Sequence, residues 1–151
     1  MVIFDVAYEK ITSHGWLSKP EARLLWDSAL KTQGAMVEIG SYQGRSAMLL
    51  GQLGRRLYCV DPWDDRFHSE LTGEEIFVQF KKHIADIPSS DIIPVRLRVE
   101  DWQPVPAEFV YCDGDHTEAG TRQQIDKALA CGPKIIAVHD VKNEGEGLVI
   151  K

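Results

Sequence analysis

The stretch at residues 36–46, M-V-E-I-G-S-Y-Q-G-R-S, constrains the fold more than any other part of the chain. A short apolar run ends at Gly40, Gly44 follows after three intervening residues, and a helix-like apolar run begins at Ser46. In α/β proteins, a strand, a glycine turn and a helix in this order bring backbone N–H groups to a ligand at the carboxyl edge of a sheet. The alternative is an ordinary strand–turn–helix in which the glycines serve geometry alone.

The spacing of these glycines argues against a phosphate-binding loop. It matches neither the G-x-G-x-x-G of dinucleotide-binding proteins nor the G-x-x-x-x-G-K-[ST] of nucleoside triphosphatases. No lysine follows Gly44, and the carboxylate of Glu38 would repel a phosphate. An acidic strand end followed by small residues favours a ligand that carries a cation and hydroxyl groups.

The size and charge of the chain narrow its class. A length of 151 residues suits one domain, and the net charge of −6 argues against a nucleic-acid partner. The sequence has no apolar run of membrane-spanning length and no signal-peptide pattern at its N-terminus. The three cysteines are widely spaced, so we expect reduced core residues rather than a disulfide or a metal set. These features predict a cytoplasmic protein without a membrane partner.

Helix-like and strand-like segments alternate along the chain. Helical spacing predicts helices over about residues 19–31, 73–86 and 119–131, and Leu30 and Leu129 are expected on their inward faces. Runs of strand-forming residues predict strands at 36–39, 56–61, 91–99, 108–113 and 134–138. The alternation predicts a doubly wound, mostly parallel α/β sheet in the order 3-2-1-4-5.

We expect residues 1–151 to form a single domain. This domain would have three parts. Residues 1–34 would form an N-terminal helical cover, in which Trp16 and Leu17 are apolar anchors. Residues 35–140 would form a Rossmann-like core, and 141–151 a short tail.

Polar side chains gather where the predicted strands end. Asp61 follows the second strand about 20 residues after Gly40, where a carboxylate can accept hydrogen bonds from both hydroxyls of a ribose. A turn or helix-capping role for Asp61 is the alternative. The runs 113–116 and 139–140 follow the fourth and fifth strands. Because parallel strands end at one edge of a sheet, we expect a single ligand pocket there.

The motifs E-I-G-x-x-x-G-x-S at 38–46, D-P-W at 61–63 and D-G-D-H at 113–116 together resemble class I S-adenosylmethionine (SAM)-dependent methyltransferases, in particular a small O-methyltransferase-like branch. The resemblance spans nearly the whole chain, from Gly15 to Asp140. It implies that SAM is the cofactor and S-adenosylhomocysteine (SAH) the product. It also implies methyl transfer to a hydroxyl of a small-molecule acceptor, such as a sugar or a polyketide-like compound.

The resemblance assigns roles to individual residues. The glycine turn of the family passes beneath the methionine part of the cofactor, and the Trp of D-P-W flanks the cofactor. The cofactor-binding positions implied are Glu38, Gly40, Ser41, Tyr42, Gly44, Ser46, Asp61, Pro62, Trp63 and Asp113. The adenine is expected beside Val99 and Glu100, although this sequence lacks the Gly or Ser usual there, and a turn role for Asp101 is equally open.

Methyl transfer from a sulfonium requires an oxygen nucleophile held in line and the removal of its proton. By resemblance, His116 matches a catalytic base with Asp113 beside it; the alternative is that His116 starts a helix and is satisfied by Asp113 or Asp115. Metal-dependent relatives bind a divalent metal ion instead, and Asp113, His139 and Asp140 fall on their ligand positions. An imidazole at 139, where the family usually has an acid or an amide, suits a softer metal than Mg²⁺.

Only residues 141–151 remain for the sixth and seventh strands that complete the family's sheet. The closing hairpin cannot be built from them, although 148–150 have the composition to start a strand or a helix. Either the chain is a truncated form, or a partner subunit covers the open edge, for example in a homodimer. Two other functions stay open: a catalytically inactive SAM- or SAH-binding module, and an unrelated Rossmann-like domain that binds a nucleotide.

Overall fold

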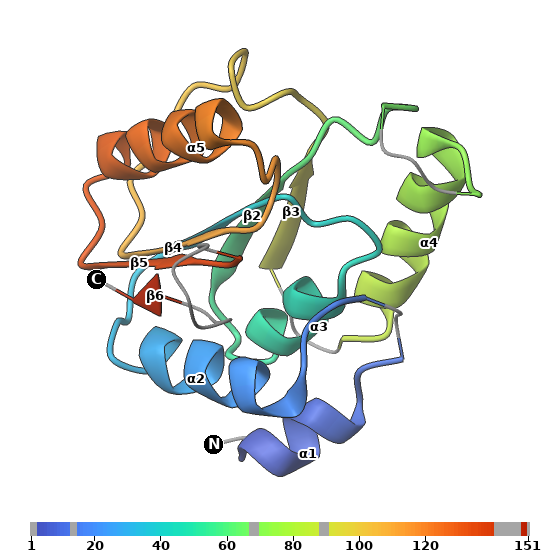
Figure 1. Ribbon diagram of the computed structural model, residues 1–151. Coiled ribbons are helices and arrows are strands. Elements are labelled where there is room, and N and C mark those ends of the chain that lie inside the picture. The colour runs from blue at the N-terminus through green and yellow to red at the C-terminus, as the bar shows by residue number, and fades with distance from the viewer. Residues whose placement is uncertain (1–2, 13–14, 67–69, 88–90, 141–148, 151) are drawn as a thin grey trace.

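The computed structural model describes residues 3–12, 15–66, 70–87, 91–140 and 149–150. Within them, one sheet has the strand order β3-β2-β1-β4-β5-β6 (Figure 1). The strands are β1 (Met36–Ile39), β2 (Arg56–Val60), β3 (Asp91–Val95), β4 (Phe109–Cys112), β5 (Ile135–Val138) and β6 (Val149–Ile150). The first five are parallel, and β6 runs antiparallel to β5. The predicted order 3-2-1-4-5 is therefore confirmed.

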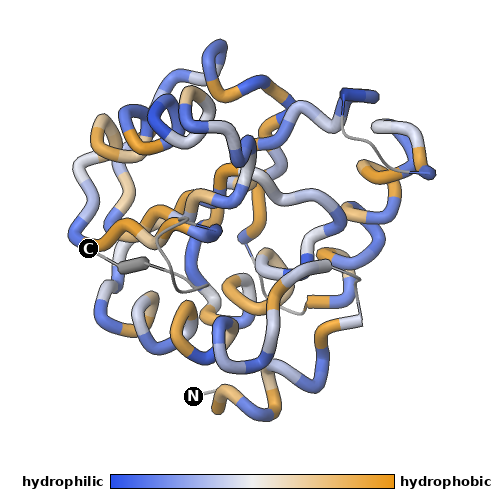
Figure 2. Tube along the Cα trace, in the orientation of Figure 1, coloured by the Kyte–Doolittle hydropathy of each residue, from blue (hydrophilic) through white to orange (hydrophobic). Residues whose placement is uncertain are grey.

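Helices cover both faces of this sheet. They are α1 (Phe4–Glu9), α2 (Lys19–Ala29), α3 (Arg45–Gly51), α4 (Gly73–Ala85) and α5 (Glu118–Ala130). In Figure 1, α5 lies on the side of the sheet opposite α1, α2 and α3. Figure 2 shows the apolar residues concentrated along the central strands and on the inner sides of the helices.

Alternation along the strands produces two hydrophobic cores, because successive side chains of a strand point to opposite faces. On β1, Met36 packs with the residues of α1 to α4, whereas Val37 and Ile39 pack on the face that Ala128 of α5 covers. All four residues of β1 and of β4 are buried, as expected for central strands of a parallel sheet. The carboxyl ends of these two strands are thereby fixed in the middle of the molecule.

Two helix starts agree with their capping-box sequences. The Ser18 hydroxyl accepts a hydrogen bond from the backbone N–H of Glu21, and the Glu21 carboxylate accepts one from the N–H of Ser18. Thr72 and Glu75 form the same reciprocal pair at the start of α4. These side-chain bonds satisfy N–H groups that the first turn of a helix leaves without partners.

Several local predictions were wrong. α2 ends at Ala29, and Leu30 is 46% exposed. Leu129 of α5 is 59% exposed, because the buried face of that helix runs through Gln124 and Ala128, and the residue after Ala128 is turned about 100° away from it. Leu17 is buried as expected, but Trp16 is 72% exposed and is not a core anchor. The strand expected over 91–99 ends at Val95, and α1 was not foreseen.

The edge of the sheet beyond β5 is partly covered. Val149 and Ile150 pair antiparallel with Val138 and Ala137, so the strand start considered for 148–150 is observed at 149–150. Leu148, expected to belong to the same element, lies outside the described residues. Among the helices that the structure describes, none has the length and apolarity needed to cross a bilayer.

Candidate functional site

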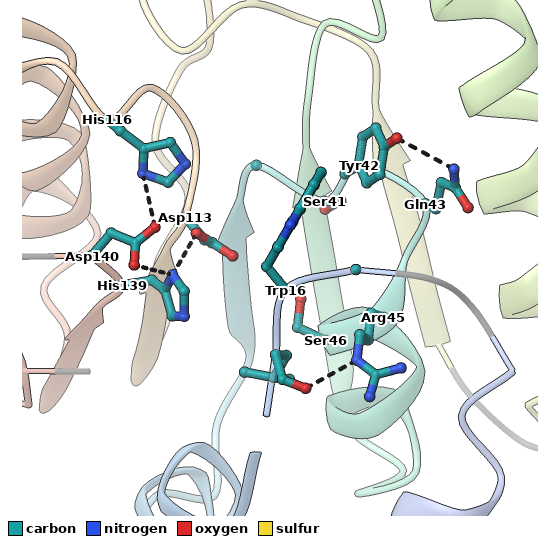
Figure 3. Close-up of a pocket in the computed structure, with 13 residues that line it drawn as sticks. Trp16, Ser41, Tyr42, Gln43, Arg45, Ser46, Asp113, His116, His139 and Asp140 are labelled. Atoms are coloured by element: carbon teal, nitrogen blue, oxygen red, sulfur yellow. Dashed lines mark hydrogen bonds and ion pairs between the residues drawn. The ribbon is translucent and has the colours of Figure 1, made fainter. Parts of the chain in front are cut away.

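A pocket of about 100 Å³ opens at the carboxyl ends of β1, β4 and β5 (Figure 3). Eight residues predicted from the sequence line it: Gly40, Ser41, Tyr42, Ser46, Asp113, His116, His139 and Asp140. The remaining lining residues come from the N-terminal segment 15–17 and from Gln43 and Arg45. The predicted meeting of the strand ends at one edge is therefore observed.

Gly40 has to be a glycine because of where the turn passes. Its φ is +89°, and an added Cβ would overlap the backbone carbonyl of Asp113 and the Cα of Gly114. The turn after β1 is consequently packed directly on the end of β4. Gly44, also at φ +89°, caps the N-terminus of α3. The backbone of the turn thus brings Ser41 and Tyr42 to the pocket while keeping Asp113 beside them.

Asp61, at the end of β2, holds this turn in place. Its Oδ2 accepts hydrogen bonds from the backbone N–H groups of Ser41 and Tyr42, both at 3.0 Å. Its Oδ1 accepts from the backbone N–H of Trp63 at 2.7 Å. Burial raises the pKa of Asp61, and these three hydrogen bonds act in the opposite direction. The carboxylate is therefore engaged with the backbone of the turn.

Trp63 lies beneath the turn. Its indole N–H donates to the carbonyl of Tyr42 at 2.8 Å, and its ring packs 4.7 Å from both Phe77 and Phe80. Trp63 is 3% exposed. Seven predicted cofactor-binding residues do not line the pocket as it stands: Glu38, Gly44, Asp61, Pro62, Trp63, Val99 and Glu100. The pocket therefore gives no support to the adenine position expected beside Val99.

Glu38 is fully buried below the pocket. Its Oε2 accepts a hydrogen bond from the Ser41 hydroxyl at 2.5 Å, while Oε1 has no hydrogen-bond partner within the described part of the chain. Burial raises the pKa of Glu38 to about 7, against the opposing effect of its hydroxyl contacts. A buried carboxyl with such a pKa exchanges its proton near neutral pH, as functional carboxyls often do.

His139 lies among three carboxylates (Figure 3). Its Nδ1 is 3.2 Å from Asp113 and 3.3 Å from Asp140, and its Nε2 is 3.3 Å from Glu21 on α2. Asp113 raises the pKa of His139 to about 9, although burial alone would lower it. Asp113 is held from the other side by the Tyr111 hydroxyl, which donates to its Oδ2 at 3.1 Å.

His116 stands at the outer rim of the pocket. Its Nδ1 is 3.6 Å from Asp140 Oδ2, and about half of its side chain is exposed. The partner is Asp140, rather than the Asp113 or Asp115 considered from the sequence. Asp140 itself has a φ of +52° and, with Tyr42 and Trp63, is one of the non-glycine residues at positive φ. Such backbone conformations collect at functional sites, where the surrounding structure enforces them.

Sequence reasoning missed three contributors to the site. Glu21 was recognised only as a capping residue, but its second carboxylate oxygen faces His139. Arg45, within the G-R-S of the turn motif, donates from Nε to the carbonyl of Leu17 at 3.1 Å and thereby brings the N-terminal segment to the pocket. Trp16 lines the pocket as well. All three contacts join segments far apart in the sequence, and no local pattern signals them.

A parallel sheet of order 3-2-1-4-5, with glycine and acidic turns at its carboxyl edge, defines a Rossmann-like methyltransferase fold. Residues 37–141 match a family model described as a methyltransferase domain. This match covers well over half of the chain, and the protein therefore belongs to that family. No curated protein sequence matches the chain.

Three solved structures illustrate the shared fold. TrmN from Thermus thermophilus superposes with a TM-score of 0.64 at 16% identity, over 87% of this chain and 40% of that one. A putative RNA methyltransferase from Pyrococcus horikoshii has a TM-score of 0.64 at 12% identity, over 93% and 73%. An O-methyltransferase from Bacillus cereus, in complex with SAH, has 0.59 at 16%, over 89% and 62%. This chain thus spans well under two thirds of TrmN.

Proposed function

We propose that this protein is a SAM-dependent methyltransferase that methylates a hydroxyl of a small molecule. The observation that carries the proposal is the turn from Gly40 to Gly44. Asp61 holds this turn above the buried Glu38. The turn lines a pocket that His116 also lines. The turn presents small side chains to the pocket, and Asp113 and Asp140 add carboxylates beside it, as a cationic cofactor with hydroxyl groups requires. Membership of a methyltransferase-domain family supports the same cofactor.

The cofactor would lie across the carboxyl end of β1. Its methionine part would rest on Gly40 and Ser41, and its ribose would approach the end of β2 near Asp61. A carboxylate has room for about four hydrogen bonds, so Asp61 can accept a ribose hydroxyl while it holds the turn. Asp113, beside Gly40, would face the reacting methyl group.

His116 is proposed as the base that takes the proton of the acceptor hydroxyl. It lines the same pocket as Asp113, and half of its side chain is exposed to an incoming molecule. Asp140 Oδ2, 3.6 Å from Nδ1, would orient the ring and stabilise its protonated form. The net charge of −6 favours a small acceptor over a nucleic acid.

As the alternative to a His116 base, a divalent metal ion is proposed for the same wall of the pocket. Asp113, His139 and Asp140 each offer one ligand atom, all within 4.8 Å of one another. Glu21 faces Nε2, the arrangement in which a carboxylate orients a metal-binding histidine. These three residues would hold the ion, which would lower the pKa of the acceptor hydroxyl. Titration with Mn²⁺ tests this: Asp140→Asn should weaken binding at least tenfold, and no binding to the wild type would refute it.

A homodimer through the β5 edge of the sheet is also proposed. Within the described residues, β6 pairs with only Ala137 and Val138, and Ile135 and Ile136 are incompletely buried. Sedimentation equilibrium at micromolar concentration should show a dimer, and a clean monomer would refute this assembly.

Calorimetry with SAM, SAH, NAD and ATP tests the function. We expect binding of SAM and SAH alone, followed by SAH release when a library of hydroxylated small molecules is supplied with SAM. Binding without turnover across a broad library would favour an inactive SAM-binding module. Binding of NAD or ATP in place of SAM would make the domain a nucleotide-binding protein instead.

A further inference from the structure

Trp16 differs from the other three tryptophans of the chain. Trp26, Trp63 and Trp102 are 2–3% exposed, whereas Trp16 is 72% exposed. Trp16 nevertheless lines the pocket, and in Figure 3 its indole stands between Asp113 on one side and Tyr42 on the other. Its ring centroid is 5.7 Å from that of Tyr42, at an interplanar angle of 37°. A large apolar side chain thus stands at the mouth of the candidate site.

The backbone on both sides of Trp16 is fixed. Leu17 is 5% exposed, and its carbonyl accepts the hydrogen bond from Arg45 Nε. On the other side, the Cα of Gly15 lies so close to Arg45 that an added Cβ would stand 3.2 Å from its Cδ. Arg45 is the first residue of α3, directly after the glycine turn. Because the indole is 72% exposed, rotation of the Trp16 side chain would disturb little of the core packing.

The present size of the pocket favours such a change. Its volume is about 100 Å³, whereas pockets for drug-sized ligands are about 300–1,000 Å³. The strands β1 and β4 below the pocket are fully buried in the sheet. Trp16 is a large exposed side chain of the lining, so its rotation would enlarge the space between Asp113 and Tyr42.

We propose that Trp16 is a cofactor-binding residue whose indole turns aside to admit SAM and then covers the sulfonium end of the bound molecule. This inference rests on the proposed function. The face of an indole attracts a cation, and the carboxylate of Asp113 borders the same space. SAM carries a sulfonium cation there, whereas SAH carries a neutral thioether. Trp16 consequently favours the substrate form of the cofactor over the product form.

Fluorescence quenching tests directly whether the Trp16 indole covers the bound cofactor, because Trp16 is exposed and the other three tryptophans are shielded. Acrylamide quenching of the wild type should fall when SAH or SAM is added at saturating concentration. Trp16→Phe should start with low quenching and show no further change on binding. Binding seen by calorimetry, with quenching unchanged or increased in the wild type, would overturn the proposal.

The affinities of Trp16 variants for SAM and SAH test whether the indole contacts the sulfonium cation. Trp16→Leu keeps an apolar side chain and should lower the affinity for SAM by about three- to thirtyfold, with a smaller loss for SAH. Trp16→Phe, which keeps a ring, should recover part of the SAM affinity. Leu129→Ala, an exposed apolar residue on α5, is the matched control and should bind both ligands as the wild type does.

Failure of the proposed function and failure of the Trp16 role alone give different binding results. If the wild type binds neither SAM nor SAH, the proposed function and the role of Trp16 fail together. If the wild type binds both, and Trp16→Leu binds both with unchanged affinity, only the role of Trp16 is refuted.

Discussion

The carboxylate of Asp61 accepts the backbone N–H of Tyr42 at 3.0 Å, and Trp63 returns a hydrogen bond from its indole N–H to the carbonyl of Tyr42 at 2.8 Å. The end of β2 is thereby joined at two points to the turn that follows β1. Tyr42 is held at a φ of +46°, a conformation that a non-glycine residue rarely adopts without such support. The shape of the turn after β1 thus depends on a residue 19 positions further along the chain.

Asp61→Asn should weaken SAH binding about tenfold or more and lower the melting temperature. An amide offers one accepting oxygen and an NH₂ group, so it cannot accept all three N–H groups that Asp61 accepts. Calorimetry and thermal unfolding check both effects. Asp64→Asn, which removes a carboxylate paired with Arg66 and Arg98 outside the turn, is the control. Equal affinities for the two variants would show that Asp61 is only a turn residue.

Glu38 should make the stability of the protein depend on pH. Its folded-state pKa of about 7 lies above the ordinary glutamate value of 4.5, so the folded protein holds the proton more tightly than the unfolded chain does. The stabilisation is fully present below pH 4.5 and is lost as the pH rises to about 7, on the order of 3 kcal/mol in all.

The comparison with Glu38→Gln isolates this effect. The wild type's free energy of unfolding, minus that of the variant, should fall across pH 4.5–7 and level off above it. Urea unfolding at several pH values gives both quantities. A difference that is constant with pH would mean that Glu38 does not titrate in this range.

His116→Ala should slow methyl transfer by about 10²-fold or more while leaving SAH affinity nearly unchanged. The ring is proposed to accept the acceptor's proton, and general base catalysis contributes rate factors of this size. Turnover with an acceptor found in the library, and calorimetry with SAH, measure the two quantities. An unchanged rate would remove His116 from the chemistry, whereas a matching loss of SAH affinity would assign it to binding.

Much of the fold was predictable because its signals are local. Gly40 and Gly44 marked the turn, and the alternation of strand and helix patterns led to the observed sheet order. Ser18 and Glu21 marked the start of α2 through a spacing of three residues. α1 carried no comparable signal, and it was missed.

The site was less predictable because it depends on contacts between distant segments. The motif places Trp63 next to the glycine turn, but its burial against Phe77 and Phe80 depends on how α4 packs. Likewise, a spacing pattern cannot reveal that Glu21 reaches His139 across 118 positions, or that Trp16 stands beside Tyr42. Sequence indicated which residues end the strands, and packing decided which of them line the pocket.

Calorimetric titration of the wild-type protein with SAH tests the central claim most directly. The account predicts saturable binding at a single site, with no binding of NAD or ATP under the same conditions. Absence of SAH binding, together with saturable binding of NAD or ATP, would contradict it.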